Sequence, residues 1–326
     1  MSKKTIPKNF AFVIFSLIVC LFVSSCSSAL SSMGVNDNKK TANLVPIYEK
    51  PQVIGTITSD EIVESSGIVA SKCQENVLWT HNDSGDGTFI FALNLKGEKL
   101  GTYKVKNSKN VDWEDIAAFK NDAGECFLYI GDIGNNARSR GEFVIYMVKE
   151  PKVVEADAKT NRKNPQKTEA AESIKFEYPD SRHDAETLLV HPQTGDMYVL
   201  TKRITGASGV YKLSKNYNRN KTTQLEKIAD VTVPAVPNGF LTGGDISSDG
   251  KRVVLCDYFA AYEILLPENA RNFDEIWKQK FNTIPLGERA QGEAVAYSPD
   301  GKSIFATSEK LNSPLIEVKR REKKSF

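Results

Sequence analysis

Apolar and polar residues alternate along most of the chain from Ile54 onward, in short segments separated by Asp-Gly, Asn-Asp and Pro-containing turns. This alternation points successive side chains to opposite faces of an extended backbone, so it predicts many short antiparallel strands. Only the stretch from Phe273 to Lys280 has a pattern that suggests a helix. We therefore expect an all-β protein.

Five segments share one design, in which a small or acidic residue stands two positions before an aliphatic residue. The first members are Ser66, Glu114, Glu186, Gly244 and Glu293, and the aliphatic members are Ile68, Ile116, Leu188, Ile246 and Val295. The aliphatic positions recur at intervals of 48, 72, 58 and 49 residues. A turn, a second strand with a polar end and a further strand follow them. Five repeats of three or four strands predict a single β-propeller.

The two ends of the repeat region indicate how the ring closes. The fifth unit ends one strand short after residues 314–319, and the strand 52–58 precedes the first unit without belonging to one. We expect five blades, with this N-terminal strand completing the last blade and removing exposed sheet edges. Six blades stay open, because the 72-residue interval has room for a degenerate blade. We interpret the excess as a charged loop over residues 155–171, before a strand that begins at Ser173.

The N-terminus has the composition of an export signal. Three lysines within the first eight residues precede an almost unbroken apolar run over residues 10–23, which is short for a membrane-spanning helix and is followed at once by small residues. The sequence Val-Ser-Ser-Cys at 23–26 resembles the lipobox of bacterial lipoproteins. The resemblance implies export, cleavage before Cys26 and a lipid anchor on that cysteine. The alternative is an ordinary secretory signal with a soluble product. Ser27 favours the outer membrane over the inner.

The predicted organisation is a signal peptide over residues 1–25, a flexible tether over 26–43 and the propeller over 44–326. The tether is rich in Ser, Asn and Lys. Removing the signal peptide, with three lysines and no acidic residue, changes the formal charge from +2 to −1. A nearly neutral domain has no bulk attraction for nucleic acid. The expected partners are the membrane of the cell envelope, through the anchor, and an unknown small-molecule or protein ligand.

Three cysteines follow Cys26 in the predicted mature chain. Cys73 and Cys126 precede equivalent second strands of neighbouring units. An exported protein can form disulfides, so either a disulfide or two free thiols fits them. Cys256 is expected to be a buried thiol.

The starts of the first strands and the ends of the second strands share one face of a propeller, and polar residues gather in these segments. Any binding or chemistry is expected on this face. The candidate rim residues are His81, Asn82, Asp83, Asp132, Asn135, His183, Asp184, Lys202, Arg203, Asp257, Tyr258 and Glu309. The alternative is that these residues only organise turns.

The repeated acidic position predicts a cation on the propeller axis. Glu114, Glu186 and Glu293, with Ser66, occupy equivalent positions and converge if the repeats are arranged around one axis. Carboxylates held close together repel one another unless they are protonated or share a cation. A set of oxygen ligands without His or Cys favours Ca²⁺ over zinc. The alternative is that these acids pair with Lys202, Arg203 or Lys310.

The blade pattern and this ring resemble the calcium-activated nucleotidases (apyrases), five-bladed propellers whose axial calcium is held by Ser and Glu at the same strand position. Phytase-like propellers are similar in a looser way. The resemblance implies an axial calcium held by Ser66, Glu114, Glu186 and Glu293. The chain departs from the pattern at Gly244, beside which Asp245 is the candidate ligand.

A shared fold does not transfer an activity. No Gly-x-Ser-x-Gly or Walker motif is present, and no catalytic residue can be assigned. The sequence therefore favours a calcium-centred binding propeller. The alternative is a calcium-dependent phosphohydrolase.

Overall fold

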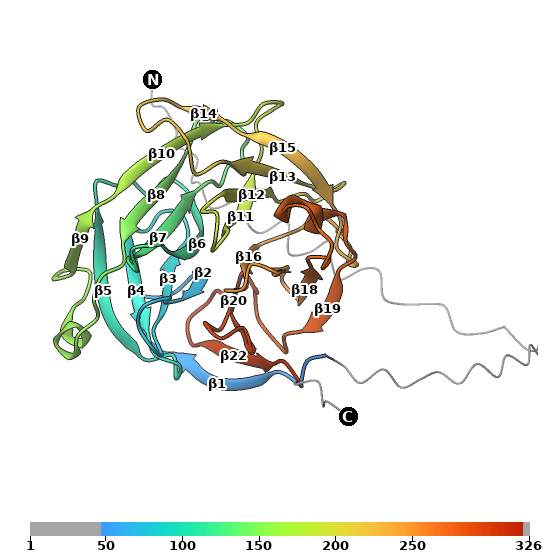
Figure 1. The fold of residues 1–326 in the computed structure, drawn as a ribbon. Coiled ribbons are helices and arrows are strands. Elements are labelled where there is room, and N and C mark those ends of the chain that lie inside the picture. Colours follow the sequence, from blue (N-terminus) through green and yellow to red (C-terminus); the bar gives the residue numbers. More distant parts are fainter. Residues whose placement is uncertain (1–46, 322–326) are drawn as a thin grey trace, which may run out of the picture. The chain divides into compact units, whose positions relative to one another are not determined.

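The computed structural model describes residues 47–321, which form five antiparallel sheets around one axis (Figure 1). This confirms the predicted five-bladed propeller. From the axis outward, the first three strands are β2 (Ser65–Ala70), β3 (Leu78–Asn82) and β4 (Phe89–Leu93) in blade 1; β6 (Trp113–Lys120), β7 (Cys126–Asp132) and β8 (Phe143–Lys149) in blade 2; β11 (Ala185–Val190), β12 (Met197–Thr201) and β13 (Ser208–Leu213) in blade 3; β16 (Gly243–Ile246), β17 (Arg252–Cys256) and β18 (Ala260–Leu265) in blade 4; and β20 (Ala294–Tyr297), β21 (Ser303–Thr307) and β22 (Ser313–Lys319) in blade 5. Each innermost strand contacts the innermost strands of its two neighbours, which closes the ring.

A fourth strand completes each blade. These strands are β5 (Lys99–Lys106), β10 (Glu172–Glu177), β15 (Glu226–Val231), β19 (Asn282–Pro285) and, in blade 5, β1 (Gln52–Ile57). β1 pairs antiparallel with β22, from Gln52 opposite Glu317 to Ile57 opposite Ser313. The N-terminal strand therefore closes the last blade, as predicted.

The long interval between the second and third repeats holds no sixth blade. Its predicted outer strand is confirmed as β10, but the preceding segment is not the unstructured charged loop that we expected over residues 155–171. It contains the 3-10 helix η4 (Glu155–Lys159) and β9 (Gln166–Ala170), and β9 pairs parallel with β5 of blade 1. The two-residue strand β14 (Thr223–Gln224) likewise adds to β10. The interval is long because its chain reaches back to the neighbouring blade.

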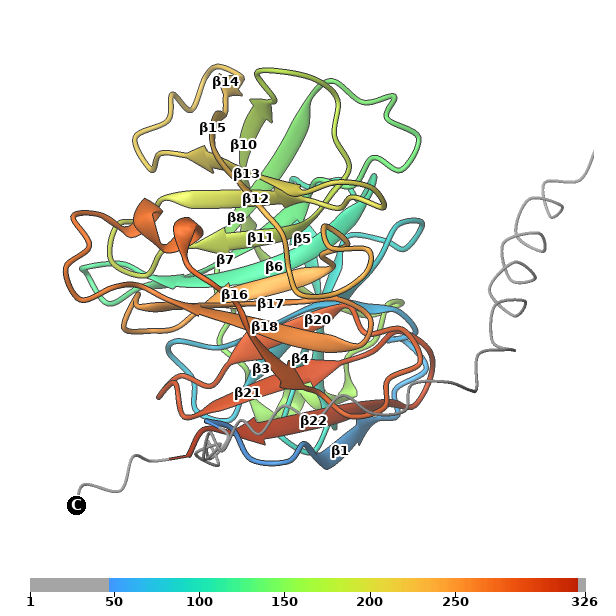
Figure 2. The same cartoon turned by 90° about the vertical axis from the view of Figure 1, so that its right-hand side faces the viewer.

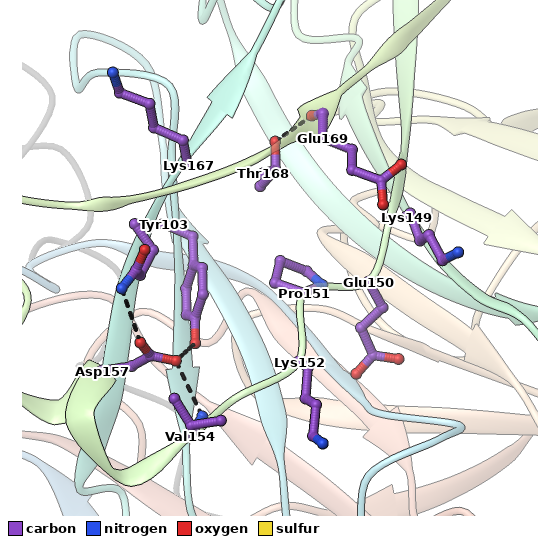
Figure 3. A pocket seen from close by; sticks show the side chains of 11 residues that line it. Tyr103, Lys149, Glu150, Pro151, Lys152, Val154, Asp157, Lys167, Thr168 and Glu169 are labelled. Atoms are coloured by element: carbon purple, nitrogen blue, oxygen red, sulfur yellow. Dashed lines mark hydrogen bonds between the residues drawn. The ribbon is translucent and has the colours of Figure 1, made fainter.

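Specific contacts attach this excursion to blade 1. The Tyr103 hydroxyl donates to Asp157 Oδ2 at 2.7 Å, and Gln166 Nε2 donates to Asp157 Oδ1 at 3.1 Å (Figure 3). The Asp157 carboxylate lies in a shallow cavity of about 450 Å³ between β5, β9 and the chain that follows β8. Hydrogen bonding uses both of its oxygens, so we interpret this cavity as a structural junction.

The core consists of five apolar layers, one between each pair of adjacent blades. Neighbouring residues of one strand enter different layers: Val199 packs between blades 2 and 3, and Leu200 packs between blades 3 and 4. The alternation of side chains along a strand therefore distributes them between two buried faces. This is why the innermost strands are buried throughout, apart from the last two residues of β6.

Two smaller expectations are also confirmed. The helical pattern near Phe273 is the 3-10 helix η5 (Phe273–Lys278), whose Trp277 packs into the layer between blades 3 and 4. Cys73 and Cys126 form a disulfide between blades 1 and 2, and Cys256 is a buried free thiol. No helix in residues 47–321 is both long and apolar enough to cross a membrane.

Candidate metal-binding site

Two faces of the propeller differ in their connections. We define the site face by the loops that lead from each outer strand to the next innermost strand and from second to third strands. We define the turn face by the turns between first and second strands. Figure 2 views the blades from the side, with η5 of the turn face at the left. The described chain also begins and ends on the turn face, where Arg321 N donates to Ile47 O at 2.8 Å.

The four predicted ring residues lie at the start of innermost strands and are almost completely buried. Ser66, Glu114, Glu186 and Glu293 are 1, 2, 3 and 3 % exposed. Burial raises the pKa of the Glu114 carboxyl well above its ordinary value, and the nearby carboxylates, Glu186 first among them, raise it further. The side chains are thus close enough for their charges to interact.

The ring residues have different partners. Both oxygens of Glu186 accept from Lys202 Nζ, at 2.5 and 2.6 Å. Burial opposes the charge on Lys202, but Glu186 more than offsets it, so the pKa of Lys202 is raised. Glu293 Oε1 accepts from Gln291 Nε2 at 3.1 Å, and Ser66 Oγ donates to the backbone oxygen of Glu114 at 2.8 Å. Pairing with Lys202, which we kept as the alternative, therefore holds for Glu186.

Asp245 connects two blades through its carboxylate. Its Oδ1 accepts from Ile246 N at 2.8 Å, and its Oδ2 accepts from Tyr297 N of blade 5 at 2.9 Å. Asp115 does the same between blades 2 and 3, with Ile116 N and Leu188 N as donors at 2.8 and 2.9 Å. Each oxygen of Asp245 already serves a buried backbone N–H, so we leave this residue out of the ligand set considered below.

Glu114 instead faces two other carboxylates, those of Asp83 and Asp112. The ligand oxygens of the three residues lie within 4.8 Å of one another. Asp83 follows β3 of blade 1, and Asp112 and Glu114 lie at the start of β6 in blade 2. Within residues 47–321, no group donates a hydrogen bond to the Glu114 carboxylate by the usual geometric criteria. We call these three residues the carboxylate site.

A glycine keeps the space beside these carboxylates open. A Cβ atom at Gly134 would lie 2.1 Å from Glu114 Oε1 and 2.5 Å from Asp112 Oδ2. Any larger residue at this position would therefore displace the two carboxylates. The space is lined by acidic oxygens, which is the environment that a hard cation prefers.

The electrostatics of the carboxylate site are unfavourable without a cation. Burial, followed by the charges of Asp112, Glu293 and Glu64, raises the pKa of Asp83 to about 6. Burial and Asp184 raise the pKa of Asp112, although Arg140 partly offsets them. A divalent cation among these oxygens would reverse the sign of the interaction.

Most of the other predicted rim residues use their polar atoms to shape the loops of the site face. Asn82 Oδ1 accepts from Val63 N and Glu64 N, both at 3.1 Å. Asp132 pairs with Arg140 at 2.8 Å. His81 lies inside blade 1, where burial lowers its pKa to about 4 and keeps it neutral.

The same holds on blades 3 and 4. Asp184 Oδ1 accepts from Asn135 N at 2.7 Å, and Asn135 Nδ2 donates to His183 O at 3.1 Å. Asp257 Oδ1 accepts from the backbone of its own turn, and its Oδ2 accepts from Tyr262. Arg203 N donates to Gly239 O of the neighbouring loop. These contacts fix the loops rather than present the side chains to a ligand.

Two acids on blade 5 form a further pair. Burial, followed by the charge of Glu293 and a hydrogen bond to it, raises the pKa of Glu309 to about 9. Glu309 therefore keeps its proton at neutral pH. Tyr258 lies nearby, and burial together with Glu293 and Glu186 raises the pKa of its hydroxyl.

The sequence reasoning missed two residues of the carboxylate site, Asp112 and Gly134. Asp112 stands two positions before Glu114 in Asp-Trp-Glu-Asp, so the period of a strand would have pointed to it. Gly134 lies in Gly-Asp-Ile-Gly-Asn-Asn, which reads as an ordinary turn. No local signal separates a glycine that opens a site from one that shapes a loop.

Comparison with known proteins shows only distant likeness. No protein-family model matches the chain, and no curated protein matches it. Among solved structures, hydrazine synthase of Kuenenia stuttgartiensis aligns with a TM-score of 0.40 at 10 % identity, over 81 % of this chain and 97 % of that one. A chain of a nidogen/laminin complex aligns with a TM-score of 0.42 at 13 % identity, over 74 % of this chain and 70 % of that one. Both likenesses are too distant to carry over an activity or a partner.

Proposed function

We propose that the protein is an exported, lipid-anchored binding protein whose propeller holds a calcium ion at the carboxylate site. Asp83, Asp112 and Glu114 would supply the protein ligands. The observation that carries the proposal is the buried carboxylate of Glu114, which has no hydrogen-bond donor and lies beside two further carboxylates. The proposed ion lies between blades 1 and 2, and it replaces the axial ion held by Glu186, Glu293 and Asp245 that the sequence suggested.

The oxygen-only ligand set favours Ca²⁺ among the common metal ions. Calcium takes six to eight oxygen ligands in flexible geometry, whereas magnesium requires a near-ideal octahedron and retains water. Three carboxylates fill only part of such a shell. The remaining positions would be available to water or to oxygen atoms of a bound ligand, so the ion would link the fold to ligand recognition on the site face.

A thermal melt of the mature chain, purified in detergent, tests the proposal. The melt is recorded without calcium, with calcium and with the same concentration of magnesium. An ion that binds only the folded state stabilises it by about 2.7 kcal/mol at 100 times its Kd, which gives a clear upward shift of Tm. Absence of a shift, together with no bound calcium in equilibrium dialysis, would contradict the proposal.

The lipid anchor lies outside the described residues and is proposed from the sequence. We expect the chain to incorporate an alkyne analogue of palmitate, and Cys26→Ser to abolish this incorporation, because the thiol is the proposed site of attachment. Cys20→Ser, in the apolar run, is the matched control and should retain the label. Mass spectrometry of the N-terminal peptide locates the modification. Label in Cys26→Ser, or none in the wild type, would rule out the anchor.

A calcium-dependent phosphohydrolase is the second candidate, and the pair Glu293–Glu309 favours it. A carboxyl group with a pKa of about 9 is protonated at neutral pH and can donate a proton to a leaving group, while a metal ion polarises a phosphoryl oxygen. This function requires phosphate release from nucleotides or sugar phosphates with calcium present. Glu309→Gln should remove the turnover and retain calcium binding. No release from either substrate class would leave binding as the function.

A further inference from the structure

Large apolar side chains are exposed on the loops of the site face. Val111, Ile204, Val236, Phe259 and Leu311 are 54, 66, 96, 76 and 56 % exposed, and each lies on a loop of that face. Exposed apolar side chains that gather on one face of a protein, next to polar groups, are typical of an interaction surface.

Three of these side chains lie on loops that are joined to one another. The loop of Ile204 is tied to the loop of Val236 by the hydrogen bond from Arg203 N to Gly239 O, at 2.8 Å. The loop of Val236 contacts the loop of Phe259 through the rings of Phe240 and Tyr258, whose centroids are 5.0 Å apart. We call Ile204, Val236 and Phe259 the apolar patch. It spans blades 3 and 4.

The base of the patch is well ordered by its contacts. Lys202 Nζ lies 4.6 Å from the ring centroid of Phe240 and 5.3 Å from that of Tyr258, and the same ammonium is paired with Glu186. A Cβ at Gly239 would lie 2.3 Å from Gly206 O, so the two loops are in close backbone contact. A surface that is ordered before binding loses less conformational entropy when a partner docks.

The charge beside the patch selects the kind of partner. Lys202 is already paired with Glu186, whereas Glu64 and Glu293 lie close enough to the carboxylate site to raise the pKa of Asp83 after burial has done so. The acids of this region therefore exceed the charge of one calcium ion. An acidic surface beside apolar side chains repels an anionic membrane and attracts a basic side chain.

We propose that the site face docks a protein segment that packs apolar side chains on the apolar patch and directs a lysine or arginine toward the acidic centre of the face. The inference deepens the proposed binding function by naming its partner class. It does not require the calcium ion, because Glu293 and Glu64 supply negative charge outside the proposed ligand set.

Selection from a displayed random 12-residue peptide library tests this inference, with the mature wild-type chain immobilised in calcium buffer. We expect enrichment of peptides that carry a lysine or arginine within a few positions of aromatic or aliphatic residues. Synthetic copies should bind the double variant Ile204→Ser/Phe259→Ser at least tenfold more weakly than the wild type. Replacing their basic residue by glutamate should weaken binding to the wild type by a similar factor.

The matched control is Val53→Ser, which changes a side chain of similar exposure (66 %) on β1 of blade 5 and should bind the peptides as the wild type does. The calcium-induced shift of Tm is recorded for every variant, so a missing shift in all of them counts against the calcium site alone. Equal binding to the double variant, enrichment of acidic peptides, no enrichment, or preferential binding to phosphatidylglycerol vesicles would each overturn the inference.

Discussion

Glu114→Gln is expected to abolish the calcium-induced rise in Tm and to leave the calcium-free protein at least as stable as the wild type. The substitution removes a negative charge and preserves the shape of the side chain. Glu114 is 2 % exposed and its nearest charged neighbours are acidic, so the calcium-free fold gains nothing from its charge. A bound calcium ion depends on that charge, and we expect its affinity to fall at least a hundredfold, or about 2.7 kcal/mol.

The pH dependence follows from the direction of the pKa shifts. Burial and neighbouring carboxylates raise the pKa of Glu114 above its value in the unfolded chain. The folded state therefore binds this proton more tightly, and its contribution to stability is complete below the unfolded pKa and is lost as the pH rises through the folded value. Calcium-free wild type should lose stability from about pH 4.5 upward, and Glu114→Gln should lose less. Chemical unfolding between pH 4 and 8 measures the difference.

Protons and calcium compete for the same oxygens. Because the pKa of Asp83 is raised to about 6, calcium affinity should decrease when the pH falls below this value. Isothermal titration at pH 5, 6 and 7.5 measures the effect.

Two further glutamates provide the controls for this experiment. Glu268→Gln, on an exposed loop of the turn face, should leave the calcium-induced shift unchanged. Glu293→Gln separates the two proposed positions of the ion, because an axial ion requires Glu293 and an ion in the carboxylate site does not. If Glu114→Gln retained the full calcium response, the carboxylate site would not hold the ion.

Removal of the Cys73–Cys126 disulfide is expected to lower the free energy of unfolding by about 4 kcal/mol. The two cysteines are 53 residues apart in the sequence, and a cross-link between them restricts the unfolded chain. The loop that it closes contains the second, third and fourth strands of blade 1 and the first strand of blade 2. Urea unfolding of the double variant Cys73→Ala/Cys126→Ala, compared with the oxidised wild type, measures the loss.

Reductant separates the cross-link from local packing. It should destabilise the wild type to about the level of the double variant, and it should leave the double variant unchanged because Cys256 is a buried free thiol. If reduction left the unfolding midpoint of the wild type where it was, the disulfide would not constrain the unfolded chain as described.

Local sequence patterns were sufficient to predict the blades, their number and the closure of the ring by β1. Each strand is specified within a few residues by alternation and by the turn that follows it, and five copies of one pattern reinforce the interpretation. The excursion over residues 155–171 was harder to predict, because β9 is short and mostly exposed and is stabilised by pairing with β5 of another blade.

The sequence by itself determined that Glu114, Glu186 and Glu293 start innermost strands, since this follows from the repeat. Only the tertiary structure decided what each carboxylate meets. Lys202 reaches Glu186, Glu309 reaches Glu293, and Glu114 meets Asp83 of blade 1 beside the space that Gly134 leaves open. The physical reason is that strand position depends on neighbours along the chain, whereas the partner of a buried charge depends on loops from adjacent blades that no local pattern brings together.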